Sequence, residues 1–278
     1  MNARTFSTAV MARRVEPSTS LDFFPTPPWA TRALCHHVLP LLKIPPQLMF
    51  RTAKDPACGE GHMALALAES FDNVEAADIF RYGFGDVADF LHPDTVEEPV
   101  DWIISNPPFN LASEFVLRAL DVAEYGVAML VRTAFLEGEG RFQKLFKRRP
   151  PSIIAQFSER VPMHRGRWVM NGKSATAYCW LVWHKHPPHD FLSTGPRFVW
   201  IPKSRIKLSR PDDWLHFSGV FDLPKTHAAM KLIEQLKKPK GYREPVLTIA
   251  QVRAEMEREA GPSPASIGDI ARELGRLI

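Results

Sequence analysis

The sequence predicts an α/β protein built on a doubly wound, mostly parallel sheet, and two observations support this prediction. Short apolar runs of strand length alternate with amphipathic runs of helical period between residues 21 and 186. Several acidic and amide residues directly follow the apolar runs, where the ligands of such sheets bind. With 278 residues, 45% of them hydrophobic, the chain is long enough for one large domain and a smaller region.

The predicted elements follow one another in a regular order. The first is a helix with apolar residues at Ala30, Leu34, Val38 and Leu41. Strands are then expected in MFRTAKD, NVEAADIF, DWIIS and GVAMLVRTAFL, and helices in HMALALAES and LASEFVLRALDVAEY. FGDVADFLHP reads as a loop or a short strand.

The pattern changes from about residue 150 onward. IIAQFSERVPMHRGRWVMNGKSATAYCWLVWHK places β-branched and aromatic runs around an NGK turn, which predicts an antiparallel hairpin that completes the sheet. The predicted organisation is a flexible leader (1–20), the sheet domain (21–186), a small irregular basic region (187–245) and a helical tail (246–278). For the tail, a helical cap is favoured over a DNA-reading helix-turn-helix, although SIGDIARELG resembles the latter.

Charge is divided unevenly along the chain. Residues 1–139 hold 10 Lys or Arg against 19 Asp or Glu, whereas residues 140–278 hold 25 against 12. An acidic half suits a small cationic ligand and a basic half suits a polyanion, unless the charges only solvate separate surfaces.

Cysteine content and hydropathy exclude several classes. Cys35, Cys58 and Cys179 are too few and too scattered for a disulfide framework or a zinc site, so we expect no metal and a reducing, cytoplasmic location. No apolar run reaches the roughly 18 residues of a membrane helix. The Arg- and Ser-containing leader overlaps in composition with a transit peptide, but a disordered leader is favoured.

A glycine loop, DPACGEG, joins a predicted strand to a predicted helix. Gly59, Gly61 and Ala64 match the pattern G-x-G-x-x-A of nucleotide-binding loops, which a tight turn explains equally well. Asp55 would oppose a pyrophosphate but attract ammonium and sulfonium groups. Asp78, which ends the next strand, is placed to accept both hydroxyls of a ribose or to serve as an ordinary loop acid.

A second motif, SNPPF, ends the predicted strand in DWIISNPPFN. Pro107 and Pro108 cannot donate backbone hydrogen bonds or continue a sheet, and they restrict the backbone of the residues before them. The chain therefore leaves the sheet rigidly at Asn106, either in a structural turn or in a site.

Together these motifs resemble those of the S-adenosylmethionine-dependent DNA adenine-N6 methyltransferases. The segments that carry the resemblance lie between residues 21 and 185, and they are FFPTP (23–27), DPACGEG (55–61), ADI (77–79), ADFL (88–91) and SNPPF (105–109). The resemblance implies the Rossmann-like fold of class I methyltransferases, S-adenosylmethionine as cofactor, and a recognition region that follows the cofactor motifs. Some RNA and protein-glutamine methyltransferases are similar at Asn-Pro-Pro-aromatic.

The resemblance also implies roles for individual residues in cofactor binding. Phe24, Pro25 and Thr26 would hold the methionine end of the cofactor, and Asp89 with Phe90 its adenine, with Asp86 as a competing acid. The predicted cofactor-binding residues are Phe24, Pro25, Thr26, Asp55, Pro56, Ala57, Gly59, Gly61, Asp78, Ile79, Asp86, Asp89 and Phe90.

The predicted catalytic residues are Asn106, Pro107, Pro108 and Phe109. The Asn106 side-chain oxygen and the Pro107 carbonyl would accept the two hydrogens of an exocyclic amine, which aims the nitrogen lone pair at the methyl donor. Phe109 would stack on a target base that has left its duplex. Cys58 lies in the glycine loop and not beside Asn106, which argues against cytosine-C5 chemistry.

Basic residues of the second half are the predicted contacts to DNA. They are Arg165, Arg167 and Lys173 near the proposed hairpin tip, and Lys203, Arg205, Lys207 and Arg210 beyond it. Trp200 and Trp214 lie among the latter group, where packing under a loop is favoured over stacking on bases.

The sequence thus predicts methyl transfer to adenine N6 in double-stranded DNA with the base flipped. An RNA or protein-glutamine methyltransferase, or an inactive binding module, are the alternatives. The recognised bases, the oligomeric state and a restriction endonuclease as partner stay open.

Overall fold

The computed structural model describes residues 22–44, 51–95, 97–166, 168–169, 172–186, 195–210, 213 and 217. The predicted leader (1–20) and helical tail (246–278) lie outside the described residues. Of the predicted basic region, 195–210, Asp213 and Phe217 are described.

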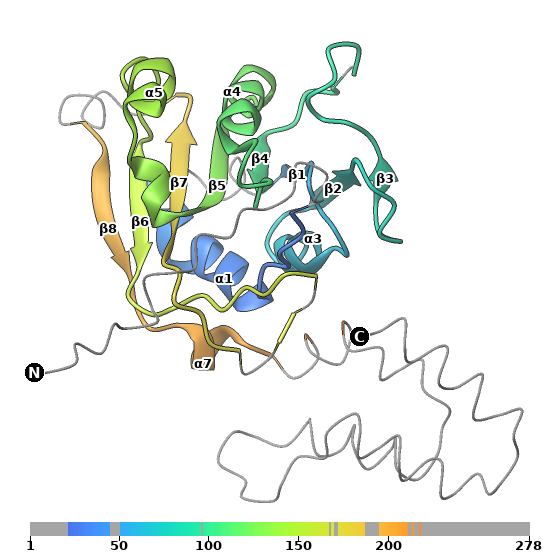
Figure 1. Ribbon diagram of the computed structural model, residues 1–278, viewed down its shortest axis with the longest axis vertical. Coiled ribbons are helices and arrows are strands. Elements are labelled where there is room, and N and C mark those ends of the chain that lie inside the picture. The colour runs from blue at the N-terminus through green and yellow to red at the C-terminus, as the bar shows by residue number, and fades with distance from the viewer. Residues whose placement is uncertain are drawn as a thin grey trace, which may run out of the picture.

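The described strands form one eight-stranded sheet in the order β3-β2-β1-β4-β5-β7-β6-β8, which Figure 1 shows from one edge to the other. The strands are β1 Thr52–Asp55, β2 Asn73–Asp78, β3 Asp86–Val87, β4 Trp102–Ser105, β5 Gly126–Arg132, β6 Ile153–Phe157, β7 Tyr178–His184 and β8 Arg197–Ile201. β7 is antiparallel to both β5 and β6, and the other neighbours are parallel. The predicted fold class is confirmed.

Helical segments cover both faces of the sheet. They are α1 Pro28–Ala33, η2 Leu34–Val38, η3 Leu39–Leu42, α3 His62–Leu67, α4 Ala112–Val122, η4 Thr133–Leu136, α5 Glu139–Arg141, η5 Phe142–Phe146 and α7 Arg205–Leu208. Trp102 and Ile104 of β4 pack into the core that contains α1, whereas Ile103 packs into the core that contains α4. Because both faces are covered, central strands such as β4 are buried at every position.

α4 shows how the sequence pattern selects one of these faces. Its buried residues Ala112, Phe115, Val116 and Ala119 follow the spacing i, i+3, i+4 and i+7 and so form one stripe. The helix ends where Ala123 turns to extended backbone, which returns the chain to the sheet at β5.

Parallel pairing brings the ends of distant strands to one edge. β1 ends at Asp55, β2 at Asp78, β4 at Ser105 and β5 at Arg132, and each strand is parallel to its neighbour in this group. This carboxyl edge therefore gathers the residues that follow the four strands.

The predicted hairpin differs from the observed connection. β6 and β7 do pair antiparallel, but their connection spans residues 158–177 and is therefore not a tight hairpin turn. This β6–β7 loop crosses the carboxyl edge, where the Gly166 N–H donates to the Phe23 carbonyl at 2.8 Å. The loop is held by packing against the first motif, which no local turn signal predicts.

The sheet also extends beyond the predicted domain end at residue 186. β8 pairs in parallel with β6, and its last residue, Ile201, is fully buried in the α1-side core. The predicted irregular region therefore contributes an edge strand to the sheet. Exposed Phe198 and Trp200 weaken the alternating pattern by which such a strand is recognised.

Candidate active site at the carboxyl edge of the sheet

A cavity opens at the carboxyl edge, between the ends of β1, β2 and β4 and the segment that precedes α1. Most of the predicted cofactor-binding residues line it. Those in the lining are Phe24, Pro25, Thr26, Asp55, Pro56, Ala57, Asp78, Ile79, Asp89 and Phe90, and Asn106 and Pro108 of the SNPPF motif line it as well.

Asp55 places a buried carboxyl group in this cavity. Its Oδ1 accepts hydrogen bonds from the Ser105 hydroxyl at 2.7 Å and from the Ala57 N–H at 3.3 Å. Burial raises the pKa of Asp55 to about 7, with a smaller contribution from the charge of Asp78, although these hydrogen bonds oppose the shift. Since both donors are neutral, a cationic ligand group would compensate the carboxylate charge.

Asp78 ties the end of β2 to the glycine loop. Its Oδ2 accepts from the Gly59 N–H at 2.9 Å and its Oδ1 from the Phe80 N–H at 3.0 Å. Burial raises the pKa of Asp78, and the backbone donors oppose that shift. Each carboxylate oxygen has a further lone pair, so the group can still accept hydrogen bonds from a ligand.

Gly59 and Gly61 belong to the glycine loop but are not in the cavity lining. Both have positive φ, 53° and 85°, and a Cβ on either would lie within 2.6 Å of the ring of Phe23 or Phe84. The Gly61 N–H donates to the Cys58 carbonyl and the Gly59 N–H to Asp78, so the loop uses these two amides internally. They are not available to a phosphate, in agreement with the argument from Asp55.

The structure separates the two acids of GDVADFL. Asp89 lines the cavity beside Phe90, and its Oδ1 accepts from the Leu91 N–H at 3.0 Å. Asp86, the competing acid, is exposed on β3 and lies outside the lining, so its role in cofactor binding stays a prediction. The two-residue strand β3 turns Asp86 away before the chain returns to the cavity.

The side chain of Asn106 is held in place through its amide nitrogen. Its Nδ2 donates to the Phe24 carbonyl at 2.9 Å and lies 3.6 Å from the Met163 sulfur. Because a carbonyl can only accept, the amide nitrogen must face Phe24, and this fixes the position of the oxygen. The buried Asn106 Oδ1 has no hydrogen-bond partner among the described residues.

Phe109 of the SNPPF motif contacts the segment that precedes α1. The Phe109 N–H donates to Asp22 Oδ2 at 2.6 Å, and Pro107 is buried. Neither Pro107 nor Phe109 is in the cavity lining. The ring of Phe109 lies 5.2 Å from that of Phe24, and the Arg132 guanidinium carbon lies 3.8 Å from the Phe109 ring centroid.

Sequence reasoning missed Asp22, Ser105, Arg132 and Met163 at this site. Ser105 and Arg132 each end an apolar strand, which is the signal that identified Asp55 and Asp78. Asp22 and Met163 lie on loops, and no sequence pattern predicts that they belong to the site.

Cys58 and the other cysteines do not show the character of nucleophiles. Burial raises the pKa of the Cys58 thiol to about 12, and nearby acids add to the shift, so the thiol stays protonated.

Within the described residues, no three His, Cys, Asp or Glu side chains gather as metal ligands would. Over the same residues, no helix has the length and apolarity needed to span a bilayer.

The predicted DNA-contacting residues fall into two groups. Arg165, Lys173, Lys203 and Lys207 are exposed, and Arg165 precedes Gly166, whose N–H donates to the carbonyl of the cavity-lining residue Phe23. Arg167 lies outside the described residues.

Arg205 and Arg210 contact the protein itself. Arg205 Nη1 donates to the Gly172 carbonyl at 3.2 Å, and Arg210 Nη2 pairs with Glu69 Oε2 at 2.8 Å. Trp200, for which the sequence favours packing under a loop, is 66% exposed.

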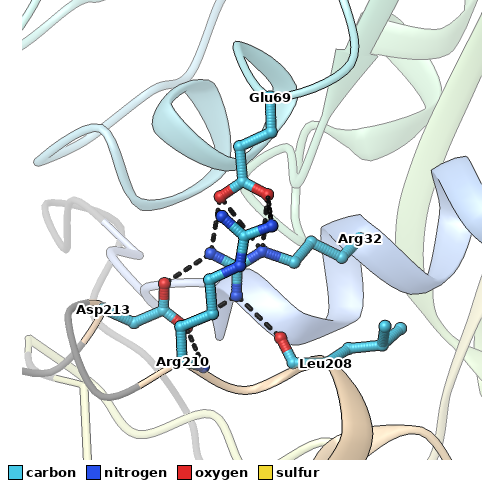
Figure 2. A network of polar contacts seen from close by, with 5 residues as sticks. All are labelled: Arg32, Glu69, Leu208, Arg210 and Asp213. Carbon is cyan, nitrogen blue, oxygen red and sulfur yellow. Dashed lines mark hydrogen bonds and ion pairs between the residues drawn. The ribbon is translucent and has the colours of Figure 1, made fainter. Parts of the chain in front are cut away.

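A buried ion-pair network joins this basic segment to the sheet domain (Figure 2). Arg32 of α1 is 4% exposed and pairs with Glu69 at 2.6 Å and with Asp213. Its Nη1 also donates to the Leu208 carbonyl at 2.7 Å. Burial lowers the pKa of Arg32, but the two carboxylates outweigh it, so the pKa is raised and the charge persists.

Comparison with known proteins found similar chains among solved structures. No protein-family model and no curated protein matches this sequence. A proposed RNA methyltransferase from Pyrococcus horikoshii is similar at 16% identity over 60% of this chain and 89% of its own, with a TM-score of 0.43. A modification subunit of a proposed type I restriction enzyme from Vibrio vulnificus YJ016 is similar at 13% identity over 74% and 54%, with a TM-score of 0.43.

A third solved structure is magnesium protoporphyrin IX methyltransferase from Synechocystis PCC 6803 with bound S-adenosylmethionine, at 14% identity over 57% of this chain and 80% of its own, with a TM-score of 0.37. All three structures share fewer than 20% of their aligned residues with this chain.

Proposed function

We propose that this protein transfers a methyl group from S-adenosylmethionine to the exocyclic N6 amine of adenine in DNA. The observation that carries the proposal is the buried, unpaired Oδ1 of Asn106 among the described residues, at the end of a central strand and in the lining of the cavity. A buried acceptor without a donor is costly, and a substrate amine would satisfy it.

The cavity residues suit the proposed cofactor. Asp55 presents a carboxylate whose hydrogen-bond donors are neutral, which favours a ligand with ammonium and sulfonium groups. Asp78 retains accepting capacity for ribose hydroxyls, and Asp89 with Phe90 offers an acceptor beside an aromatic wall for an adenine. Bound S-adenosylmethionine would supply an electrophilic methyl group.

The chain's own part in the reaction is to orient the amine. An amine on an aromatic ring is a poor nucleophile because its lone pair is delocalised into the ring. Asn106 Oδ1 and the Pro107 carbonyl would accept its two hydrogens and favour a more tetrahedral nitrogen. The bond from Asn106 to Phe24 fixes the oxygen beforehand, so no reorganisation is needed when the amine arrives.

A nucleic acid is the proposed substrate because basic side chains lie along the same edge, and the resemblance of FFPTP and SNPPF to the motifs of DNA adenine-N6 methyltransferases favours DNA. Exposed Arg165, Lys203 and Lys207 would contact phosphates, and β8 ends at this edge with exposed Trp200. A base inside a duplex cannot reach a buried Asn106, so the target would be flipped into the site.

The test is transfer of labelled methyl from S-adenosylmethionine to unmethylated duplex DNA, with RNA in parallel. We expect the label to appear as N6-methyladenine. Asn106→Ala should lower the rate of methyl transfer at least 100-fold, which is the order of loss seen when a key hydrogen-bonding group of the transition state is removed. Asn110→Ala is the matched control, because this exposed amide lies four residues further on. Label in RNA but not DNA, or undiminished activity in Asn106→Ala, would contradict the proposal.

A further inference from the structure

We propose that Arg132 occupies the target-base position of the unliganded protein and must leave it before the base can stack on Phe109. Arg132 is thereby a positioning residue that controls entry to the site. The inference rests on the proposed function, since it assumes that a planar base is the group that binds beside Asn106.

The guanidinium of Arg132 lies where a base would stack. Its carbon is 3.8 Å from the centroid of the Phe109 ring and 5.9 Å from that of Phe24. Planar guanidinium groups stack on aromatic faces much as bases do. The two therefore compete for one face of Phe109.

The remaining sides of Phe109 are filled by the core. Phe109 packs against the α1-side hydrophobic core, in which Phe24 is 7% and Tyr178 is 3% exposed. The rings of these residues lie 5.2 Å and 6.2 Å from that of Phe109. A base cannot displace two buried aromatic residues without disrupting the core.

Arg132 is the member of this cluster that can move. It ends β5, is partly exposed, and carries a long side chain. Its buried Nε has no hydrogen-bond partner among the described residues, so departure breaks no hydrogen bond at that atom. Burial raises the pKa of the Tyr178 hydroxyl, the nearby charge of Arg132 opposes that larger effect, and water can take the place of the guanidinium beside that hydroxyl.

The test compares two labelled oligothymidines, one with a single central adenine and one with an abasic site at that position. Each is bound in the presence of S-adenosylhomocysteine, and the ratio of the two dissociation constants isolates the contribution of the base. We expect Arg132→Ala to raise the adenine preference by about tenfold, because the competing cation–π contact is lost. Arg132→Met, which keeps much of the side-chain stem, should raise it less.

Arg141→Ala is the matched control, since Arg141 makes a similar contact, 5.1 Å from the ring of Phe135, outside the site. Cofactor affinity serves as the test of folding, because Arg132 is not in the cavity lining. If Arg132→Ala binds the cofactor normally but its adenine preference is unchanged or reduced, the proposed role of Arg132 is overturned and the proposed function is not. No adenine preference in either the wild type or the variants would overturn the proposed function as well.

Discussion

At the scale of single residues, the site depends on polar groups that the fold buries before any ligand arrives. Asn106 is oriented by one hydrogen bond to Phe24, and Asp55 by hydrogen bonds from Ser105 and Ala57. Each is thus held in position while retaining capacity for a ligand. Burial makes both groups costly to the fold, as is common for functional residues.

Asp55 leads to a prediction on pH. Its pKa of about 7 means that the carboxylate, the form that attracts a cation, is lost as pH falls below 7. We expect the dissociation constant for S-adenosylmethionine, measured by titration calorimetry, to rise by about tenfold between pH 7.5 and pH 6. Asp55→Asn should bind weakly and without this dependence. If the dependence survives in that variant, Asp78, whose pKa is also raised, becomes the responsible group.

The raised pKa of Asp55 also affects the stability of the unliganded fold, in the direction opposite to its effect on cofactor affinity. The unfolded chain loses the Asp55 proton near the ordinary pKa of 3.8, whereas the folded chain keeps it to about 7. Between these values the folded state binds more protons, so the contribution of Asp55 to stability falls as pH rises through the window. Conditions that favour the proposed cofactor therefore disfavour the unliganded fold at this residue.

At the scale of elements, β8 joins the sheet to the basic half of the chain. Its Phe198 and Trp200 are 53% and 66% exposed, and their rings lie 5.2 Å apart. The strand runs parallel to β6 and so ends at the carboxyl edge, from which Lys203 and Lys207 follow. Aromatic and basic side chains in this arrangement suit a nucleic-acid strand.

We therefore predict that Trp200→Ala weakens nucleic-acid binding. Loss of one stacking contact is worth about 1–3 kcal/mol, so the dissociation constant for single-stranded DNA, measured by fluorescence anisotropy, should rise at least fivefold. Phe142→Ala is the control, because Phe142 is 48% exposed but belongs to η5 and not to β8. Equal affinities of the two variants would contradict a role for β8 in binding.

The elements also explain what the sequence could and could not predict. Asp55, Asp78 and Asn106 each end or follow an apolar strand within a motif, so their meeting at one edge follows from parallel pairing alone. Arg132 ends such a strand too, but a single Arg after an apolar run reads as a solvated end. The path of the β6–β7 loop and the choice between Asp86 and Asp89 depend on tertiary packing, which local patterns do not encode.

At the scale of the whole molecule, the Arg32 network connects the two halves of the chain. It joins α1 and Glu69, from the acidic half, to Leu208, Arg210 and Asp213, from the basic half. The network therefore fixes the basic segment relative to the cavity. Sequence analysis gave no role to Arg32, because an Arg in an amphipathic helix is ordinarily on its solvated face.

We predict that Arg32→Ala lowers the free energy of unfolding by about 3–5 kcal/mol, because it leaves the nearly buried carboxylate of Asp213 without its cation and removes one of the two cations that pair with Glu69. Denaturant unfolding measures this loss. Arg149→Ala is the matched control: its pair with Asp121 is 2.6 Å long, but both side chains are about half exposed, so the loss should stay below about 1 kcal/mol.

The same variant tests whether the network couples the halves or only stabilises one of them. If the network fixes the basic segment, Arg32→Ala should weaken nucleic-acid binding, measured without denaturant at a temperature where the variant is still folded. Cofactor affinity should stay unchanged, because Arg32 is not in the cavity lining. An equal loss of both affinities would show that the network supports the sheet domain as a whole. Retention of both, together with a stability loss no greater than that of Arg149→Ala, would contradict any structural role for the network.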